Sequence, residues 1–535
     1  YGLPFQYHPS FQFQLKSLFE PLDLLFQSST FWDAFINNKK VMFFQRMLKA
    51  EDIWISVLEK VDGRILASEQ NERLFWNFQT AAFSGHLRIV EWLHQDENED
   101  CAGYAMDSAA VNGFLNIIEW LHENRKEGCS RKAMDDSAKN GHLLTVKWLH
   151  TNRSEGCSKK AMNDAAANGH LQILEWLHSH RHEGCTTNAA NYAAGNGQLQ
   201  VLEWLLRNRQ EGFTDRAMDL AAGYGRISTL TWLHFNQQAN CSTDAMDYAS
   251  KNGHLSIIKW LHSFRNEGCT VKAMNDAAGY GHLSVLEWLH SNRTEGCTTR
   301  AMDSAAGNGH FAIVEWLHQH RSEGCTTAAL DLATGGGHLQ VAKWLHSNRQ
   351  EGATSRAIDL ASTNGFLEVV EWALRSDLPV PTTAAMDGAA AKGHLQVVKW
   401  LHSQRFEGCT TCAMDFAAAN GHFDVVDFLH KNRSEGCTDE ALSLAAGFGR
   451  LKMVEWLWCN GLASSAEAAV EEAAESGFLS VVRWLCIHCK VRLPQDVIDD
   501  ALRNRHLPVV QWLENVPEGK NHQKAFSQEW CRNFI

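Results

Sequence analysis

The residue types that could do chemistry recur at one fixed interval along the chain. Cysteine, histidine and acidic side chains are common metal ligands, nucleophiles and general acids or bases. Here two histidines and one acidic or amide residue recur in most 28-residue intervals, and ten cysteines share a single place in the interval. An active site needs one constellation whose members have different roles. A side chain repeated along the whole chain is therefore interpreted as architecture, and we expect the carboxylates to hydrogen-bond a neighbouring turn or a helix N-terminus.

The periodic cysteines are predicted to be free thiols. Neighbouring units that pack through helices lie roughly 8–10 Å apart, whereas a disulfide needs Cα atoms within about 7 Å. We expect small buried thiols in a reducing compartment. The residues concerned are Cys101, Cys129, Cys157, Cys185, Cys241, Cys269, Cys297, Cys325, Cys409 and Cys437.

No metal, cofactor or catalytic site is expected. Cys486 and Cys489 form a single C-x-x-C, which is half of a zinc site, and no second half accompanies it. The cluster His178, His180 and His182 is interpreted as a solvated helix end. The sequence contains no P-loop, dinucleotide fingerprint or nucleophile elbow. The prediction is a protein that is not an enzyme.

The composition excludes several classes of protein. The 535 residues are 44% hydrophobic and 21% charged, which fits neither a disordered nor a membrane protein. The net charge of −13 argues against a nucleic acid as the main partner, since phosphate binding draws on Lys and Arg. We expect a protein of the cytoplasm or nucleus. The sequence begins with Tyr1, which leaves the true N-terminus and a removed targeting segment open.

Tryptophan reveals the elements that must position these side chains. Between Trp92 and Trp512 a tryptophan recurs every 28 residues, with Phe428 filling one gap. The period defines sixteen copies over residues 77–524, between a head of residues 1–76 and a tail of residues 525–535. We number each copy 1 to 28, with position 1 at Ala105 in copy 2. A period of this length is typical of a stacked repeat array, in which the tryptophans are expected to be internal.

Each copy is predicted to be a helical hairpin. Ser or Thr at position 26 suits an N-cap, and Gly at position 9 suits the residue just after a helix; a short Ala-rich helix A is expected between them. Helix B should follow over about positions 10–20. Its apolar positions 11, 13, 14, 16 and 17 need neighbours on two sides, which predicts an all-α solenoid. Arg at position 21 and Glu at position 23 recur together and are interpreted as exposed pairs that favour solubility and register.

The consensus A-M-D-x-A-A-x-N-G-H-L-x-V-V resembles the ankyrin repeat. The resemblance covers the sixteen copies, but the period is 28 residues instead of 33. It implies a short repeat that lacks the protruding β-hairpin finger, similar to repeats of expanded protist families. It also implies that helix A lines the concave side of the stack.

The ends and two breaks depart from the repeat. The aromatic-rich head, residues 1–76, is expected to be a helical cap or a separate docking module. The final copy is degenerate, as a terminal repeat should be. Copy 6 around Gln238 and copy 11 around Asp377 lack the usual turn sequence, and whether the stack bends there is left open.

The partner site should lie where the copies differ. Positions 4 and 8 of helix A share a face, and position 4 accepts Asp, Gly and Phe alike, so this face is expected to be exposed. Tyr is favoured at protein interfaces; chance variation on a tolerant surface is the alternative. The predicted partner-binding residues are Tyr192, Leu220, Tyr224, Tyr248 and Tyr280, followed by Phe416, Leu444 and Phe448.

These features predict a non-enzymatic scaffold or adaptor that binds another protein or peptide. Two alternatives are a substrate-recognition subunit of a ubiquitin ligase, docked through an F-box-like head, and a structural component of a large assembly. A locally basic group, Arg131, Lys132, Lys159 and Lys160, is interpreted as a solvated edge. The oligomeric state is left open.

Overall fold

The computed structural model describes residues 78–94, 104–404, 408–489, 491, 495–504 and 506–514. The chain forms two compact units, residues 1–130 and 131–535, which we describe separately. Thirty-two helices, α6 to α37, account for the regular structure of the described residues. The fold is therefore the predicted all-α repeat solenoid. The predicted cap of residues 1–76 and the tail of residues 525–535 lie outside the described residues.

Every copy contributes one helix A and one helix B. The A helices are α6 (Phe78–Ser84), α8 (Ala105–Val111), α10 (Arg131–Lys139), α12 (Lys159–Ala167), α14 (Thr187–Asn196), α16 (Arg216–Gly223), α18 (Asp244–Lys251), α20 (Val271–Gly279), α22 (Thr299–Gly307), α24 (Thr327–Gly335), α26 (Arg356–Thr363), α28 (Thr383–Ala391), α30 (Thr411–Asn420), α32 (Glu440–Gly447), α34 (Glu467–Glu475) and α36 (Gln495–Arg503). The B helices are α7 (Leu87–His94), α9 (Leu115–Asn124), α11 (Leu143–Asn152), α13 (Leu171–His180), α15 (Leu199–Asn208), α17 (Ile227–Gln237), α19 (Leu255–Phe264), α21 (Leu283–Asn292), α23 (Phe311–His320), α25 (Leu339–Asn348), α27 (Leu367–Arg375), α29 (Leu395–Gln404), α31 (Phe423–Asn432), α33 (Leu451–Cys459), α35 (Leu479–His488) and α37 (Leu507–Glu514).

Local sequence sets both ends of helix A. At the start of α12, the Ser158 hydroxyl accepts a hydrogen bond of 3.1 Å from the backbone amide of Lys160, which satisfies an otherwise unpaired helical donor. After α10, Gly141 takes a φ of +89°, a conformation that favours glycine. A Cβ at Gly141 would also lie 2.8 Å from the His170 ring of the next copy. The predicted cap and stop signals are confirmed.

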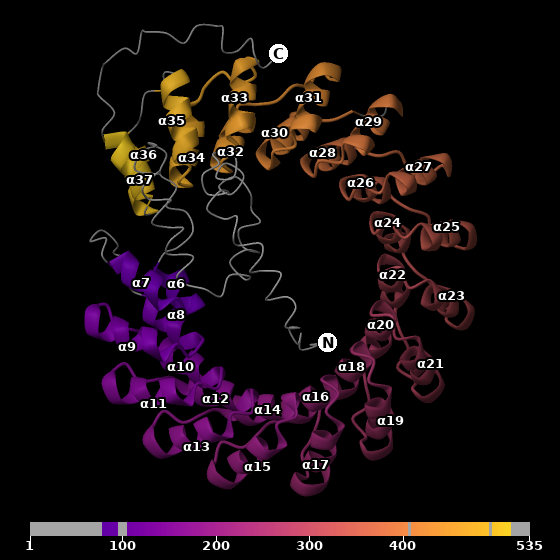
Figure 1. Cartoon of the computed structure of the whole chain (residues 1–535). Coiled ribbons are helices and arrows are strands. Elements are labelled where there is room, and N and C mark those ends of the chain that lie inside the picture. Colours follow the sequence, from indigo (N-terminus) through magenta and orange to yellow (C-terminus); the bar gives the residue numbers. More distant parts are fainter. Residues whose placement is uncertain are drawn as a thin grey trace, which may run out of the picture. The chain divides into compact units, whose positions relative to one another are not determined.

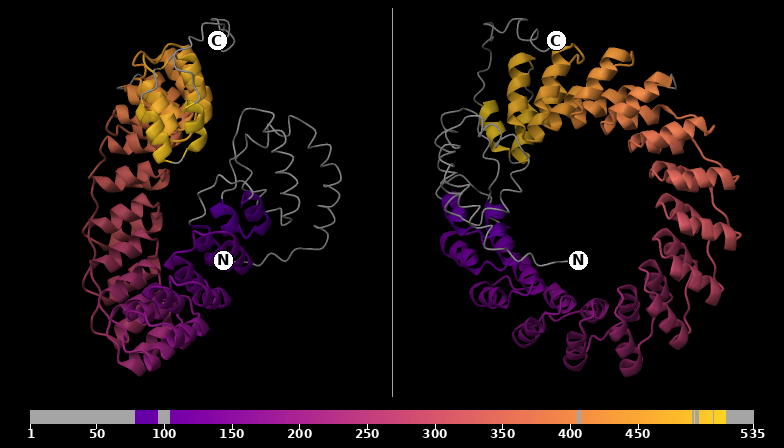
Figure 2. Two further views of the ribbon diagram at one scale, coloured as in Figure 1. Left: turned by 90° about the vertical axis from the view of Figure 1, so that its left-hand side faces the viewer. Right: turned by 45° about the vertical axis from the view of Figure 1, so that its right-hand side comes forward.

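The core lies between consecutive copies. Helices A of neighbouring copies, such as α14 and α16, make the most extensive contacts, because small residues such as Ala193 and Ala221 are fully buried between them. Leu at position 17 of helix B, for example Leu205, is buried as well. Within residues 131–535, the even-numbered helices form an inner row and the odd-numbered helices an outer row (Figures 1 and 2). Helix A thus lines the inner side of this unit.

Two expectations need correction or detail. The tryptophans with described side chains are mostly half-buried on helix B rather than internal. Trp176, for example, packs edge-on against His150 of the preceding copy, with ring centroids 5.1 Å apart.

The two sequence breaks have unusual backbone conformations. Among the described residues, the only non-glycine residues with positive φ are Gln238 at +49° and Asp377 at +53°. Both lie in the sequence breaks of copies 6 and 11, where an unusual turn keeps the helices in register.

Candidate functional site

The repeated acidic residue at position 3 joins consecutive copies. The Asp135 carboxylate accepts hydrogen bonds from the backbone amide and the hydroxyl of Ser158, at 2.8 and 2.6 Å. Ser158 is itself the N-cap of the next helix A, so the expected bond to a helix N-terminus is confirmed. Where the residue is Asn, as in Asn163, the amide makes the equivalent pair of bonds to Thr186. Burial raises the pKa of Asp219, despite the opposing bonds from Ser242. These carboxylates are structural.

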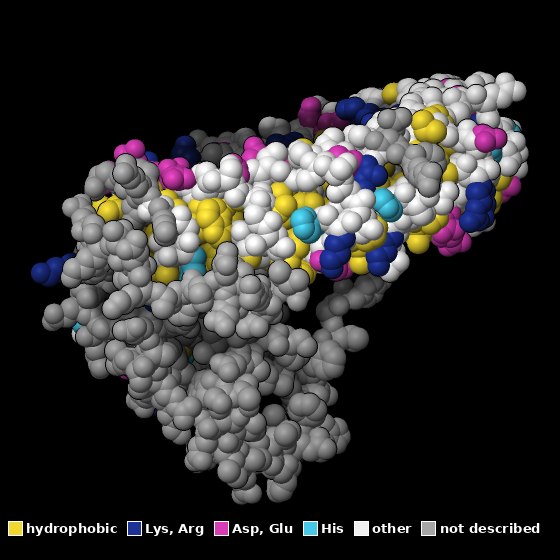
Figure 3. All heavy atoms as spheres, turned by 90° about the horizontal axis from the view of Figure 1, so that it is seen from above, with side chains coloured by type: hydrophobic (Ala, Val, Ile, Leu, Met, Phe, Trp, Pro, Cys, Tyr) yellow, Lys and Arg dark blue, Asp and Glu magenta, His cyan; other side chains and the backbone are white. Residues whose placement is uncertain are grey.

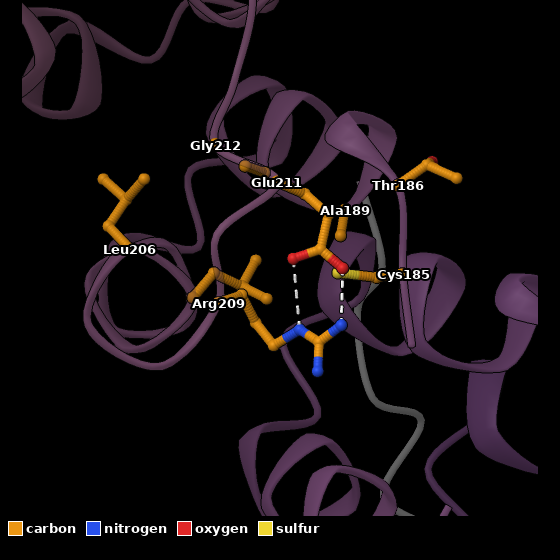
Figure 4. A pocket seen from close by; sticks show the side chains of 9 residues that line it. Cys185, Thr186, Ala189, Leu206, Arg209, Glu211 and Gly212 are labelled. Carbon is orange, nitrogen blue, oxygen red and sulfur yellow. Dashed lines mark hydrogen bonds and ion pairs between the residues drawn. The ribbon is translucent and has the colours of Figure 1, made fainter. Parts of the chain in front are cut away.

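The Arg and Glu of positions 21 and 23 also stabilise the stack. The Arg209 guanidinium donates two hydrogen bonds to the Glu211 carboxylate beside Cys185, as Figure 4 shows. The pair is half-buried, which corrects the expectation of an exposed pair, because the guanidinium packs against Gly184 of the preceding turn. The bond from Arg209 lowers the pKa of Glu211 to about 2, and burial raises the pKa of the Cys185 thiol to about 11. Such a thiol is unreactive at neutral pH.

Asn at position 8 is a third connection between copies. Its side-chain amide donates a hydrogen bond to the backbone carbonyl at position 7 of the preceding copy, for example Asn168 to Lys139 at 2.7 Å. The His170 ring at position 10 contacts the same carbonyl at 3.0 Å. The bond is present for Asn112, Asn168, Asn196, Asn252, Asn308, Asn364, Asn420 and Asn504.

Three predicted partner-binding residues replace this Asn. Tyr224, Tyr280 and Phe448 occupy position 8 and are 52%, 56% and 56% exposed. None of them has a side-chain amide, so these copies cannot make the connecting bond in the same way. Replacing Asn by an aromatic ring leaves apolar surface in contact with solvent and does not restore the hydrogen bond to the preceding copy. These exceptions to the repeat are the strongest sign of a binding role on helix A.

The predicted residues at position 4 have a second constraint. Position 4 packs against position 7 of the preceding copy: a Cβ at Gly223 would lie 2.8 Å from the Tyr248 Cβ, and one at Gly195 would lie 2.9 Å from the Leu220 Cβ. Large residues at position 4 accordingly follow Gly or Ala at position 7, whereas Lys251 precedes Asp276. Position 4 therefore does take part in packing, contrary to the expectation of a free surface. Its size varies together with the size of the residue at position 7 of the preceding copy.

The eight predicted residues therefore differ in accessibility. Tyr248 and Phe416 are exposed, Tyr192 and Leu444 are half-buried, and Leu220 is only 8% exposed. All lie on or just after inner-row helices: α14 to α20 carry the first group, and α30 to α32 carry the second. We call Tyr192, Tyr224, Tyr248 and Tyr280 the tyrosine strip.

Charged side chains accompany the tyrosine strip. The Arg216 guanidinium lies 5.8 Å from the centre of the Tyr192 ring, and the Lys251 ammonium lies 5.1 Å from that of Tyr280. Both are cation–π distances. The Tyr248 hydroxyl lies 3.4 Å from the Asp244 carboxylate, whose charge raises the pKa of Tyr248. The strip is thus an aromatic surface with a cation next to two of its four rings and a carboxylate next to a third.

Comparison with known families agrees with this architecture. Residues 162–206, 217–262 and 274–318 match "Ankyrin repeats (many copies)", and residues 384–467 match "Ankyrin repeats (3 copies)". The chain contains ankyrin repeats. None of the curated proteins compared with the sequence matches it.

Solved structures similar to this ankyrin-repeat chain include a helical-repeat protein of another kind. The crystal structure of the pentatricopeptide repeat protein PPR10 from maize has 11% identity and a TM-score of 0.27, covering 82% of this chain and 78% of that chain. PPR10 in complex with an 18-nt psaJ RNA element has 11% identity and a TM-score of 0.34, covering 83% and 74%. At these scores we infer no shared ligand.

The outer row of the ankyrin-repeat stack has a feature that the sequence analysis missed. Phe235 and Phe264, in adjacent copies, are both exposed, and their ring centroids lie 5.8 Å apart. Phe264 also stacks on Trp260. Phe235 occupies position 19, which varies among the copies, and Phe264 occupies position 20, which is most often Asn. Two large apolar residues at the polar end of helix B were the available signal. On the face that Figure 3 shows, hydrophobic and His side chains are interspersed with charged ones.

Two small cavities lie between consecutive copies. The cavity beside Cys185 and Arg209 has a volume of about 10 Å³, enough for about one water; an equivalent cavity lies beside Cys325. Across the described part of the chain, no three His, Cys, Asp or Glu side chains are grouped to hold a metal ion. None of the described helices has the length and apolar character needed to cross a bilayer.

Proposed function

We propose that this ankyrin-repeat chain is a non-enzymatic scaffold that binds another protein or peptide through the inner helix-A face. The tyrosine strip in copies 5–8 is the main contact surface, and Phe416, Leu444 and Phe448 form a second one. The observation that carries the proposal is the replacement of the connecting Asn by exposed Tyr224, Tyr280 and Phe448. Tyrosine suits such a surface because it offers a large contact area at small entropic cost.

The experiment is an affinity purification of the full chain, followed by mass spectrometry. The test variant replaces Tyr192, Tyr224, Tyr248 and Tyr280 by Ser. The control variant replaces Phe235 and Phe264 of the outer row by Ser, which removes exposed aromatic surface from copies 6 and 7, in the middle of the same stretch.

We expect the tyrosine variant to lose a partner that the wild type and the outer-row variant retain, with unchanged helical circular dichroism. Retention of every partner by the tyrosine variant would reject the proposal. Capture of a cullin adaptor through residues 1–76 would instead favour the ubiquitin-ligase role, and co-migration with a heavy particle would favour the structural role.

A further inference from the structure

The inner row carries an exposed basic residue at the start of many of its helices. Position 28 lies in the first helical turn, and it is basic in six of the nine A helices from α10 to α26. All six side chains are exposed. We call them the basic edge: Lys132, Lys160, Arg216, Lys272, Arg300 and Arg356.

Helix stability does not explain the basic edge. The positive end of the helix macrodipole lies at the N-terminus, where acidic side chains are favoured and basic ones are not. The later helices of the same row have the stabilising choice, with Glu440 at the start of α32 and Asp496 at the start of α36. The repeat therefore tolerates acidic residues here, and the basic ones in α10 to α26 need another reason.

The basic edge is continuous with the tyrosine strip. Positions 28, 4 and 8 are four residues apart and share one face of helix A. On α16 this face carries Arg216 and then Tyr224; the Arg216 guanidinium also lies over Tyr192 of the preceding copy. On α20 it carries Lys272 and then Tyr280. A ligand on the tyrosine strip would thus lie beside a row of cations.

We propose that the partner segment bound here is an extended acidic peptide with apolar side chains between its carboxylates. This inference rests on the proposed function. Adjacent A helices lie about 8–10 Å apart, and three residues of a polyproline-II chain span about 9 Å and bring every third side chain to the same side. Acidic side chains spaced by multiples of three residues can therefore meet the copies that carry a basic residue. Carboxylates pair with the basic edge, and the intervening apolar side chains contact the tyrosine rings.

A nucleic acid fits this face less well. Asp164, Asp244 and Asp276 lie on the same face as the tyrosine strip and the basic edge, and they would repel a backbone charged at every unit. A peptide can place neutral residues beside them. The net charge of −13 for the whole chain also disfavours a nucleic acid.

The test uses the full chain and fluorescence anisotropy. The probe is a labelled synthetic peptide, long enough to reach from Lys160 to Arg300, in which Glu-Leu-Glu units face the copies that carry the basic edge and neutral Ser-Leu-Ser units face the other copies; we call it the Glu-Leu-Glu peptide. A Lys-Leu-Lys peptide and an oligothymidylate of matched length are the comparison ligands. The test variant is Lys160→Glu/Lys272→Glu/Arg300→Glu. The control variant is Lys147→Glu/Lys259→Glu/Lys343→Glu, which inverts as many exposed charges on the outer row.

We expect the Glu-Leu-Glu peptide to bind the wild type, with an affinity that falls as salt is raised. The inner variant should bind about tenfold or more weakly, and the control should stay within about twofold. Because acidic residues suit helix N-termini, the inner variant should keep or raise its melting temperature, so lost binding would not reflect unfolding. Equal binding by both variants, equal binding of the Lys-Leu-Lys peptide or tighter binding of the oligothymidylate would overturn the inference.

The same variants separate this inference from the proposed function. If the inner variant keeps a purified partner that the tyrosine variant loses, the acidic preference is wrong and the scaffold proposal stands. If neither variant loses a partner, both are wrong.

Discussion

The side-chain amide of Asn252 donates a hydrogen bond of 2.8 Å to the backbone carbonyl of Gly223 in the preceding copy. The same bond connects copies along the described stack, and a buried carbonyl that finds such a partner stabilises each junction. Asn252 occupies position 8 of copy 7. In the two neighbouring copies, 6 and 8, the same position is Tyr224 and Tyr280. In the proposed function, the binding surface and the stability of the junction therefore compete for the same position.

Tyr224→Asn should stabilise the protein and weaken partner binding. The new amide can bond the carbonyl of Gly195, as Asn252 bonds that of Gly223, and one such bond is worth about 1 kcal/mol. Urea unfolding should show a higher midpoint. Tyr280→Asn should gain less, because it also removes the Lys251 cation–π contact, worth about 0.5–1 kcal/mol at an exposed site. Asn308→Tyr is the reverse control and should lower the midpoint, since it deletes the bond to Gly279.

Gly223→Ala should destabilise the protein although alanine is the better helix former. Alanine gains about 1 kcal/mol of helix propensity, but its Cβ would lie 2.8 Å from the Tyr248 Cβ, and such overpacking costs about 1–3 kcal/mol. The matched control is Gly447→Ala, at the same position of α32, where the nearest atom is the Glu472 Cβ at 3.3 Å. That variant should be neutral or stabilised in thermal unfolding. A stabilised Gly223→Ala would mean that the close packing of Tyr248 relaxes easily.

The parts of the fold that depend on local or strictly periodic residues could be predicted from the sequence. Ser158 and Gly141 act within their own helix ends, and the repeated carboxylate at position 3 had to have a repeated partner. The half-buried state of Arg209 and Glu211 could not be predicted, because it depends on how closely the guanidinium approaches Gly184 of the preceding copy. From the sequence alone, Arg209 and Glu211 look like an ordinary exposed ion pair, because the close contact with Gly184 involves a residue of another copy.

The candidate site stays a prediction, and one packing constraint on its residues was missed. Position 4 varies from Gly388 to Tyr248, which suggests a free surface when the position is considered alone. The structure places it against position 7 of the preceding copy, where Thr363 faces Gly388 and Gly223 faces Tyr248. The matched sizes were present in the sequence, but only the geometry identifies which two positions should be compared.

Asp247→Asn should maintain or raise stability at neutral pH. Asn can make both bonds to Thr270, as Asn275 does to Thr298, and it removes a carboxylate whose pKa is raised by burial. Because the folded pKa lies above the unfolded value of 3.8, the carboxylate's contribution to stability decreases as pH rises through that interval. The advantage of Asn in urea unfolding should therefore be largest at pH 7 and shrink toward pH 4. Asp247→Ala is the control and should lose about 1–2 kcal/mol, because Thr270 loses its partner.

Glu211→Gln should destabilise the protein at pH 7 and have no effect near pH 2. The bond from Arg209 lowers the folded pKa of Glu211 to about 2, from 4.5. A lowered carboxylate pKa contributes stability above 4.5, and this contribution is lost as pH falls toward 2. Urea midpoints of wild type and variant should therefore converge over that window. Glu203→Gln is the matched control: its pairing with the largely exposed Arg207 spans 3.8 Å and should contribute little at any pH. A difference between wild type and Glu211→Gln that is independent of pH would show that the loss comes from packing rather than from the charged pair.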